Sequence, residues 1–272
     1  STHSYGEPEF AAAVASGRLD RAIFDAESEI NPFAGWSAVY VPHSTGDLHG
    51  GANPAVEVLN VAQPVVMVGA QNVEAMLVEV AAGHPEVEQV IVAGTGGGGL
   101  GALLNYEAVV EAFPTARVDV LMDSVIVPQT QALLPDCFFR RISAGWPQSY
   151  PADWNRYVTR NQGQKFAGVY EYLAAKYPEA TFGVLSSGAD ATVRAVLGRA
   201  ADECSGTDRL PAETYGEALA DLDTLFGEIG GWSLFVVSGE GHGFLTGEAP
   251  NIGELQTTRI AEWLNRYRAP SG

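Results

Sequence analysis

Short apolar runs alternate with segments of helical periodicity along most of this 272-residue chain. Each run is followed by Gly, Asp, Ser or His, residues that favour turns and helix starts over continued strand. The predicted strands are 38–42, 65–68, 90–93, 118–122, 182–185 and 233–237, and the predicted helices are 73–82, 99–113, 167–176, 192–202, 215–229 and 254–267. This alternation favours the α/β class, with a mostly parallel sheet flanked by helices.

The chain contains no internal repeat and no low-complexity linker, so we expect one domain over residues 1–272. Residues 127–164 are rich in proline and follow neither a helical nor a strand period. We expect this stretch to form a cap or an insertion at one edge of the sheet, because long irregular segments often cover a ligand site.

The formal net charge of −18 opposes binding to phosphate backbones and to anionic lipid. No stretch approaches the roughly 18 apolar residues of a membrane helix. We therefore predict no nucleic-acid partner and no membrane partner. The two cysteines, Cys137 and Cys204, permit one disulfide without establishing it.

The predicted strand 90–93 runs into the glycine-rich turn GTGGGG at positions 94–99, and a helical pattern follows. The turn satisfies the dinucleotide fingerprint G-x-G-x-x-G, with Asp119 and Asp123 as candidate ribose-binding acids, which would suit an NAD-dependent enzyme. It also satisfies the nucleophile elbow G-x-S-x-G at every position except the centre, where Gly96 replaces serine. Both interpretations remain open on the turn alone.

Partners for an elbow are expected where later strands end, in the chain order nucleophile, acid, histidine. Asp190 follows the predicted strand 182–185, and His242 follows the predicted strand 233–237 in a Gly-rich loop. The carboxyl ends of parallel strands meet at one edge, so these residues are the candidate acid and base. Asp190 is equally suited to cap the helix that begins near Thr192.

The loop PHSTGDLHGG contains His43, Asp47 and His49, which are residue types that bind metals. Two histidines and one acid are an unspecific pattern, and we predict neither a metal nor a cofactor. Among the aromatic residues, Trp36, Trp146 and Trp154 are candidates for substrate binding or for the core.

Several segments together resemble the pectin acetylesterase and Notum family of carboxylesterases. NPFAGW at 31–36 with VYVPHSTGDLHGG at 39–51 is similar to that family's NPF…W…VYVPYCTGDVHxG. AGTGGGGLGALLN at 93–105 is similar to its GxSAGGxGAxxN, and Asp123-Ser124 and the SGAD segment at 187–190 continue the likeness.

The resemblance implies an α/β-hydrolase fold and hydrolysis of an acyl ester of a carbohydrate or another polymer, outside the cytoplasm. Position 96 would be the nucleophile, His242 the general base, Asp190 the orienting acid and the Gly97 N–H an oxyanion donor. Because Gly96 has no hydroxyl, we expect this chain to be an inactive form. The alternative is a natural pseudoenzyme that binds an acyl or glycan ligand without turnover.

Two departures from the family pattern matter. Ser44 stands where the family has a cysteine, so the family's disulfide at that position cannot form here. Family members place a strand and a glycine-rich loop that supplies further oxyanion donors before the NPF segment, and nothing in residues 1–37 matches them. We expect that this strand and loop are missing from this sequence.

Overall fold

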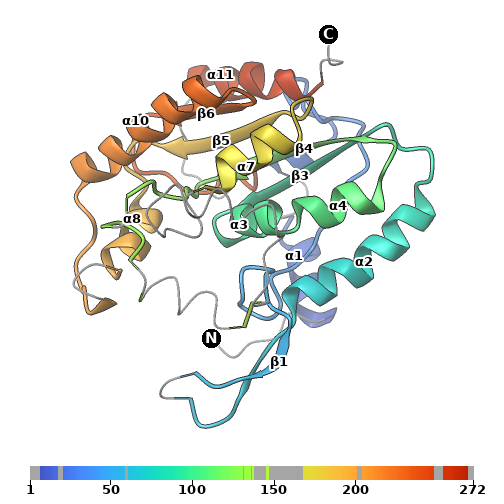
Figure 1. Ribbon diagram of the computed structural model, residues 1–272. Coiled ribbons are helices and arrows are strands. Elements are labelled where there is room, and N and C mark those ends of the chain that lie inside the picture. Colours follow the sequence, from blue (N-terminus) through green and yellow to red (C-terminus); the bar gives the residue numbers. More distant parts are fainter. Residues whose placement is uncertain are drawn as a thin grey trace.

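The computed structural model describes residues 7–17, 21–58, 61–130, 132–135, 137, 145–146, 168–200, 204–247 and 254–268. Most of the predicted insertion 127–164 lies outside these residues. At the centre is a four-stranded parallel sheet in the order β3-β4-β5-β6 (Figure 1). Its strands are β3 (Gln89–Thr95), β4 (Arg117–Asp123), β5 (Phe182–Ser187) and β6 (Trp232–Val237). The predicted α/β architecture with a mostly parallel sheet is confirmed.

The two faces of the sheet are covered by different helices. Val120 and Met122 of β4 point into the larger core cluster, which also holds residues of α3, α4, α7, α8 and α10. Leu121 points the other way, into a smaller cluster formed with α11. All six residues of β5 are buried, which explains why this strand reads as a continuous apolar run rather than an alternating one.

The helices lie close to their predicted positions, except for α1, which was not predicted. They are α1 (Glu7–Ala15), α2 (Gly69–Gly83), α3 (Gly97–Leu104), α4 (Tyr106–Ala112), α7 (Val169–Lys176), α8 (Ala191–Gly198), α10 (Ala212–Ile229) and α11 (Glu254–Leu264), with short 3-10 turns at Ala22–Phe24 and Asn265–Tyr267. The single helix predicted over 99–113 is wrong, because it is divided at Asn105 into α3 and α4. The Asn105 side chain donates to the His49 carbonyl oxygen at 2.9 Å, so a tertiary contact lies at this break.

Two strand predictions in the first third of the chain need correction. The predicted strand 38–42 is not a strand in the structure, and its residues are exposed or partly buried rather than buried. A β-like sequence forms a strand only where a neighbouring strand supplies the ladder hydrogen bonds. Residues Val65–Met67 do form a strand, β2, but it pairs antiparallel with β1 (Asn53–Val56) outside the main sheet. This hairpin projects away from the sheet in Figure 1.

Cys137 and Cys204 form a disulfide across 67 residues of sequence. The sequence permitted this pairing without requiring it. None of the described helices is long and apolar enough to cross a membrane.

Candidate active site

The glycine-rich turn joins β3 to α3 through an unusual backbone conformation. Gly96 has φ 54° and ψ −120°, a combination that residues with a side chain rarely adopt. A Cβ atom at Gly94 would overlap the carbonyl group of Gly98, so the strand and helix backbones approach closely here. The Gly96 N–H also donates to the Asp123 carbonyl oxygen of the neighbouring strand at 2.8 Å. A tight strand-to-helix turn of this kind, with a positive φ at its centre, is the geometry of a nucleophile elbow.

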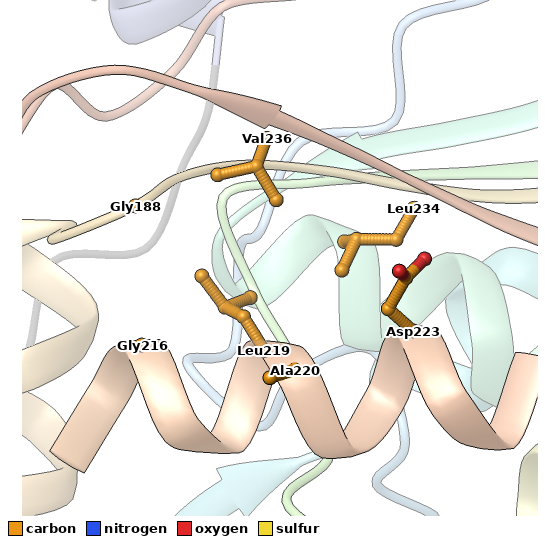
Figure 2. A pocket seen from close by; sticks show the side chains of 7 residues that line it. All are labelled: Gly188, Gly216, Leu219, Ala220, Asp223, Leu234 and Val236. Carbon is orange, nitrogen blue, oxygen red and sulfur yellow. The ribbon is translucent and has the colours of Figure 1, made fainter. Parts of the chain in front are cut away.

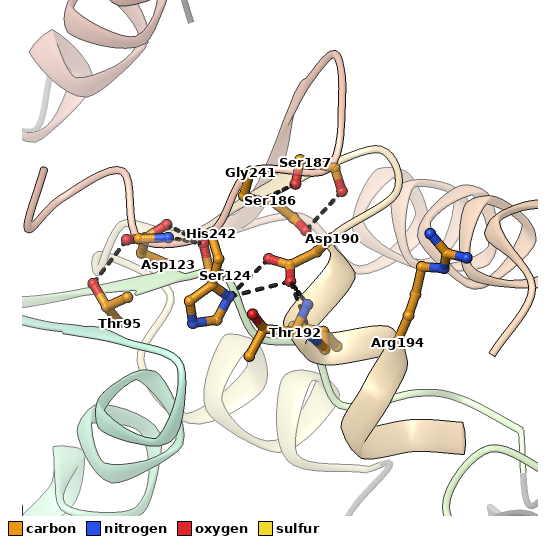
Figure 3. A network of polar contacts seen from close by, with 12 residues as sticks. Thr95, Asp123, Ser124, Ser186, Ser187, Asp190, Thr192, Arg194, Gly241 and His242 are labelled. Atoms are coloured by element: carbon orange, nitrogen blue, oxygen red, sulfur yellow. Dashed lines mark hydrogen bonds and ion pairs between the residues drawn. The ribbon is translucent and has the colours of Figure 1, made fainter. Parts of the chain in front are cut away.

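His242 and Asp190 lie side by side beyond the ends of β6 and β5. His242 Nδ1 is 2.9 Å from Asp190 Oδ2 and 3.2 Å from Oδ1. Figure 3 shows the imidazole and the carboxylate facing one another. The Asp190 side chain is fully buried and the His242 side chain is partly exposed, so a buried carboxylate holds a ring that reaches the surface.

Asp190 also caps α8, as the alternative interpretation of the sequence expected. Its Oδ1 accepts hydrogen bonds from the N–H groups of Thr192 and Val193, each at 2.9 Å. The shorter contact to His242 uses the other oxygen, Oδ2. The two roles therefore use different oxygens and are compatible, and the cap fixes the carboxylate that orients the histidine.

The elbow places position 96 next to the pair formed by His242 and Asp190. A Cβ atom built at Gly96 would lie 3.2 Å from His242 Nε2. A side chain at position 96 would therefore contact the imidazole nitrogen that Asp190 does not hold. The fold thus brings together the carboxyl-terminal ends of β3, β5 and β6 at Gly96, Asp190 and His242, the residues singled out in the sequence. Gly97 follows as the first residue of α3, where an N–H has no acceptor within the helix.

Hydrogen bonds join the loop that contains His242 to the segment after β5. The Ser187 hydroxyl donates to the Gly241 carbonyl oxygen. Backbone hydrogen bonds join Gly188 N–H to the Val237 carbonyl oxygen at 2.8 Å and Ala189 N–H to that of Gly239 at 3.0 Å. These contacts limit the movement of the histidine relative to Asp190.

A buried carboxylate at the end of β4 links the elbow to the same loop. Asp123 accepts hydrogen bonds from the hydroxyls of Thr95 at 2.7 Å and Ser124 at 2.8 Å, and from the Leu245 N–H at 2.9 Å. Ser124 in turn accepts from the Gly243 N–H at 2.9 Å. Burial raises the pKa of Asp123 to about 6, although these hydrogen bonds and the nearby His242 act to lower it. Sequence reasoning missed this network; the polar pair directly after a buried strand was the available signal.

The second histidine loop lies against α3 but does not form a cluster of metal ligands. Asp47 is buried and accepts from the N–H groups of Gly69 at 2.7 Å and His49 at 3.1 Å. The rings of His43 and His49 stack at 4.9 Å instead of converging on the carboxylate. Among the residues that the structure describes, no group of three or more His, Cys, Asp or Glu side chains could hold a metal ion.

The three candidate tryptophans have different positions. Trp146 is 5% exposed, lies in the larger core cluster and donates from Nε1 to the Asp47 carbonyl oxygen at 2.9 Å. Trp36 is 37% exposed and packs edge-on against Phe33. Trp154 lies outside the described residues. Burial assigns Trp146 to the core, and Trp36 keeps an exposed ring.

A cavity of about 330 Å³ lies between α10 and β6 (Figure 2). Its lining is mostly apolar, with Asp223 at one end. Neither Gly96 nor Asp190 nor His242 lines it. We therefore place the candidate site at the elbow rather than in this cavity.

Comparison with known proteins agrees with this fold. Residues 16–134 match the family model described as pectinacetylesterase. The Wnt deacylase Notum from Drosophila has a similar structure in one crystal form, with a TM-score of 0.61 and 17% identity, covering 97% of this chain and 82% of Notum. A second crystal form gives a TM-score of 0.59 and 16% identity, with coverage of 99% and 84%. No curated protein matches the chain in sequence. At these identities the likeness to Notum concerns the fold alone, which is of the α/β-hydrolase type.

Proposed function

Because residues 16–134 match the pectinacetylesterase family model, we propose that the site of this chain is that of a serine-type carboxylic ester hydrolase with glycine at the nucleophile position. The observation that supports this most is the arrangement around His242. Nδ1 contacts Asp190 at 2.9 Å, and Nε2 lies 3.2 Å from where a Cβ atom at position 96 would be. This is the order of contacts in an acid, base and nucleophile triad.

With serine at position 96, the reaction would follow from these contacts. His242 Nε2 would take the hydroxyl proton as Oγ attacks the ester carbonyl carbon, and Asp190 would stabilise the resulting imidazolium. The Gly97 N–H would donate to the developing oxyanion. His242 would then give the proton to the departing alcohol, and water would release the acid from the acyl-enzyme by the same sequence of proton transfers.

With Gly96 the acyl-enzyme cannot form, because there is no hydroxyl to attack. The histidine and its carboxylate remain in place, so water activation by His242 is the chemistry left to the site. Removal of such a nucleophile lowers the rate by several orders of magnitude. The same observation favours a second candidate function, in which the chain binds an acyl or glycan ligand without turnover.

We propose an ester substrate carried on a carbohydrate or another polymer, by analogy with the name of the family. A location outside the cytoplasm is supported by the Cys137–Cys204 disulfide, since such bonds persist in oxidising compartments.

The test is the variant Gly96→Ser, with Gly96→Ala as its matched control. Both variants place a Cβ atom in the same positive-φ conformation and next to the same imidazole, so both accept about 1 to 3 kcal/mol of backbone strain. Only serine adds a nucleophile. With 4-nitrophenyl acetate we expect Gly96→Ser to raise kcat/KM by about 10³-fold or more over both the parent chain and Gly96→Ala.

A second substitution, His242→Ala in the Gly96→Ser chain, is expected to return the rate to the parent level. If Gly96→Ser folds and shows no more turnover than Gly96→Ala, the hydrolase proposal is wrong. Tight binding of an acetylated oligosaccharide by the parent chain, with that result, would favour the binding function.

A further inference from the structure

The loop that contains His43 and His49 packs along the helix that begins at the elbow. A Cβ atom at Gly97 would lie 2.9 Å from Leu48 Cδ2 and 3.7 Å from His43 Cε1. One helical turn further, a Cβ atom at Gly101 would lie 2.6 Å from His49 Cδ2. The glycines of α3 thus allow the loop to approach closely, and His43 is placed beside the residue that follows position 96.

Hydrogen bonding determines which nitrogen of His43 bears the proton. Nε2 accepts from the Leu48 N–H at 2.8 Å, so in the neutral ring the proton is on Nδ1. Desolvation lowers the pKa of His43 below its usual range, although the nearby Asp47 carboxylate acts to raise it. The lowered pKa favours the neutral ring. Stacking on His49 restrains the ring plane.

The Nδ1–H group has no acceptor among the described residues, and part of the ring is exposed. Nδ1 would lie 3.9 Å from a Cβ atom at Gly97. A neutral donor is therefore held next to the proposed oxyanion position, while His242 lies against position 96. The two histidines approach consecutive residues of the turn.

We propose that the His43 Nδ1–H donates a hydrogen bond to the carbonyl oxygen of the ester bound over the elbow, together with the Gly97 N–H. This inference rests on the proposed function. A neutral side-chain donor aimed at the oxygen on which charge develops stabilises the transition state more than the ground state. His43 would thus be a substrate-contacting residue in addition to His242 and Asp190.

The first test uses the parent chain and needs no turnover. Two-dimensional NMR that correlates the ring nitrogens of His43 with its carbon-bound protons reports the tautomer directly. We expect the Nδ1–H tautomer at pH 7 and a change of the Nδ1 shift on titration with 4-nitroacetanilide, a stable acetyl compound. The Nε2–H tautomer, or an Nδ1 shift that does not respond to the titration, would overturn the proposal.

The second test compares two substitutions in the Gly96→Ser chain. His43→Gln keeps an acceptor near Nε2 for the Leu48 N–H and removes the Nδ1 donor, whereas His43→Asn keeps a donor near Nδ1. We expect His43→Gln to lower kcat for 4-nitrophenyl acetate by about 10²-fold with KM changed less than about threefold, and His43→Asn to retain most of kcat.

Equal losses of kcat in the two variants, or a loss that follows the fall in thermal stability, would contradict the assignment of His43 as a donor. The two proposals fail separately. An inert Gly96→Ser chain removes the hydrolase function, and the NMR titration then decides whether His43 contacts an acyl group.

Discussion

An aspartate and a histidine lie near the glycine turn in two places, Asp190 with His242 after β5 and β6, and Asp47 with His43 and His49 in one loop, yet the two carboxylates have different partners. Asp190 gives one oxygen to the backbone of α8 and the other to His242. Asp47 gives both oxygens to backbone N–H groups, those of His49 and Gly69. In this chain, the aspartate that contacts an imidazole is the one with a carboxylate oxygen that no backbone N–H group uses.

The surroundings of each histidine follow from this difference. His242 has a carboxylate on Nδ1 and presents Nε2 to position 96. His43 has a backbone donor on Nε2 and presents Nδ1–H to Gly97. One ring is arranged to accept a proton and the other to donate a hydrogen bond.

The largest expected effect separates the two aspartates. In the Gly96→Ser chain, Asp190→Asn should lower kcat by about 10³- to 10⁴-fold, because the amide cannot stabilise the imidazolium. Its effect on stability should be within about 1 kcal/mol, because Asn is a good helix cap. Asp47→Asn should cost about 1 to 3 kcal/mol of stability, because its amide NH₂ would face a backbone N–H, with kcat within tenfold of the parent.

Steady-state kinetics and urea unfolding of both variants measure these quantities. Comparable losses of kcat at the two sites would mean that the loops do not differ as described.

The next effect concerns pH and His49, which is 8% exposed. Burial, aided by His43 and opposed by Asp47, lowers the pKa of His49 to about 4. The unfolded chain, with a histidine pKa of about 6.5, binds this proton first as the pH falls. The contribution of His49 to the free energy of unfolding is therefore fully present above about pH 6.5. It is lost as the pH falls toward 4, by up to about 3 kcal/mol.

Asp123 acts in the opposite direction. Its folded pKa of about 6 is raised, so its contribution is present below about pH 4 and is lost as the pH rises toward 6. Urea unfolding of the parent chain and of His49→Gln between pH 4 and 7 isolates the histidine. Between pH 6.5 and 4, the parent should lose more stability than the variant, and parallel pH profiles would contradict the assignment.

The smallest expected effects test how the histidine loop packs on α3. Gly101→Ala should destabilise the chain by about 1 to 3 kcal/mol, because its Cβ atom would lie 2.6 Å from His49 Cδ2. Gly98→Ala is the matched control in the same helix, because a Cβ atom there would meet nothing within 4 Å, and it should stabilise the chain by about 0.4 to 1 kcal/mol. Thermal unfolding measures the stability of both variants. Equal stabilities would show that the histidine loop moves to accommodate the Cβ atom at position 101 without loss of stability.

The strands of the sheet could be predicted because their burial leaves a local signal. β5 is buried along its whole length, and its predicted core 182–185 lies inside the observed Phe182–Ser187. Segment 38–42 also reads as a strand in the sequence but is not part of a β-ladder in the structure, because pairing with another strand is not a local property. The division of the helix at Asn105 likewise accompanies a contact with His49, which lies 56 residues away.

For the candidate site, too, some features follow from local sequence and others from tertiary contacts. The sequence by itself determined that a tight turn follows β3, since glycines allow the close approach of strand and helix, and that Asp190 caps α8, since a cap bonds to residues two and three positions ahead. Only the tertiary structure decided that His242 meets Asp190 and that His43 meets the first residue of α3. The first contact depends on β5 and β6 being parallel neighbours, and the second on a loop folding back over glycines that leave room for it.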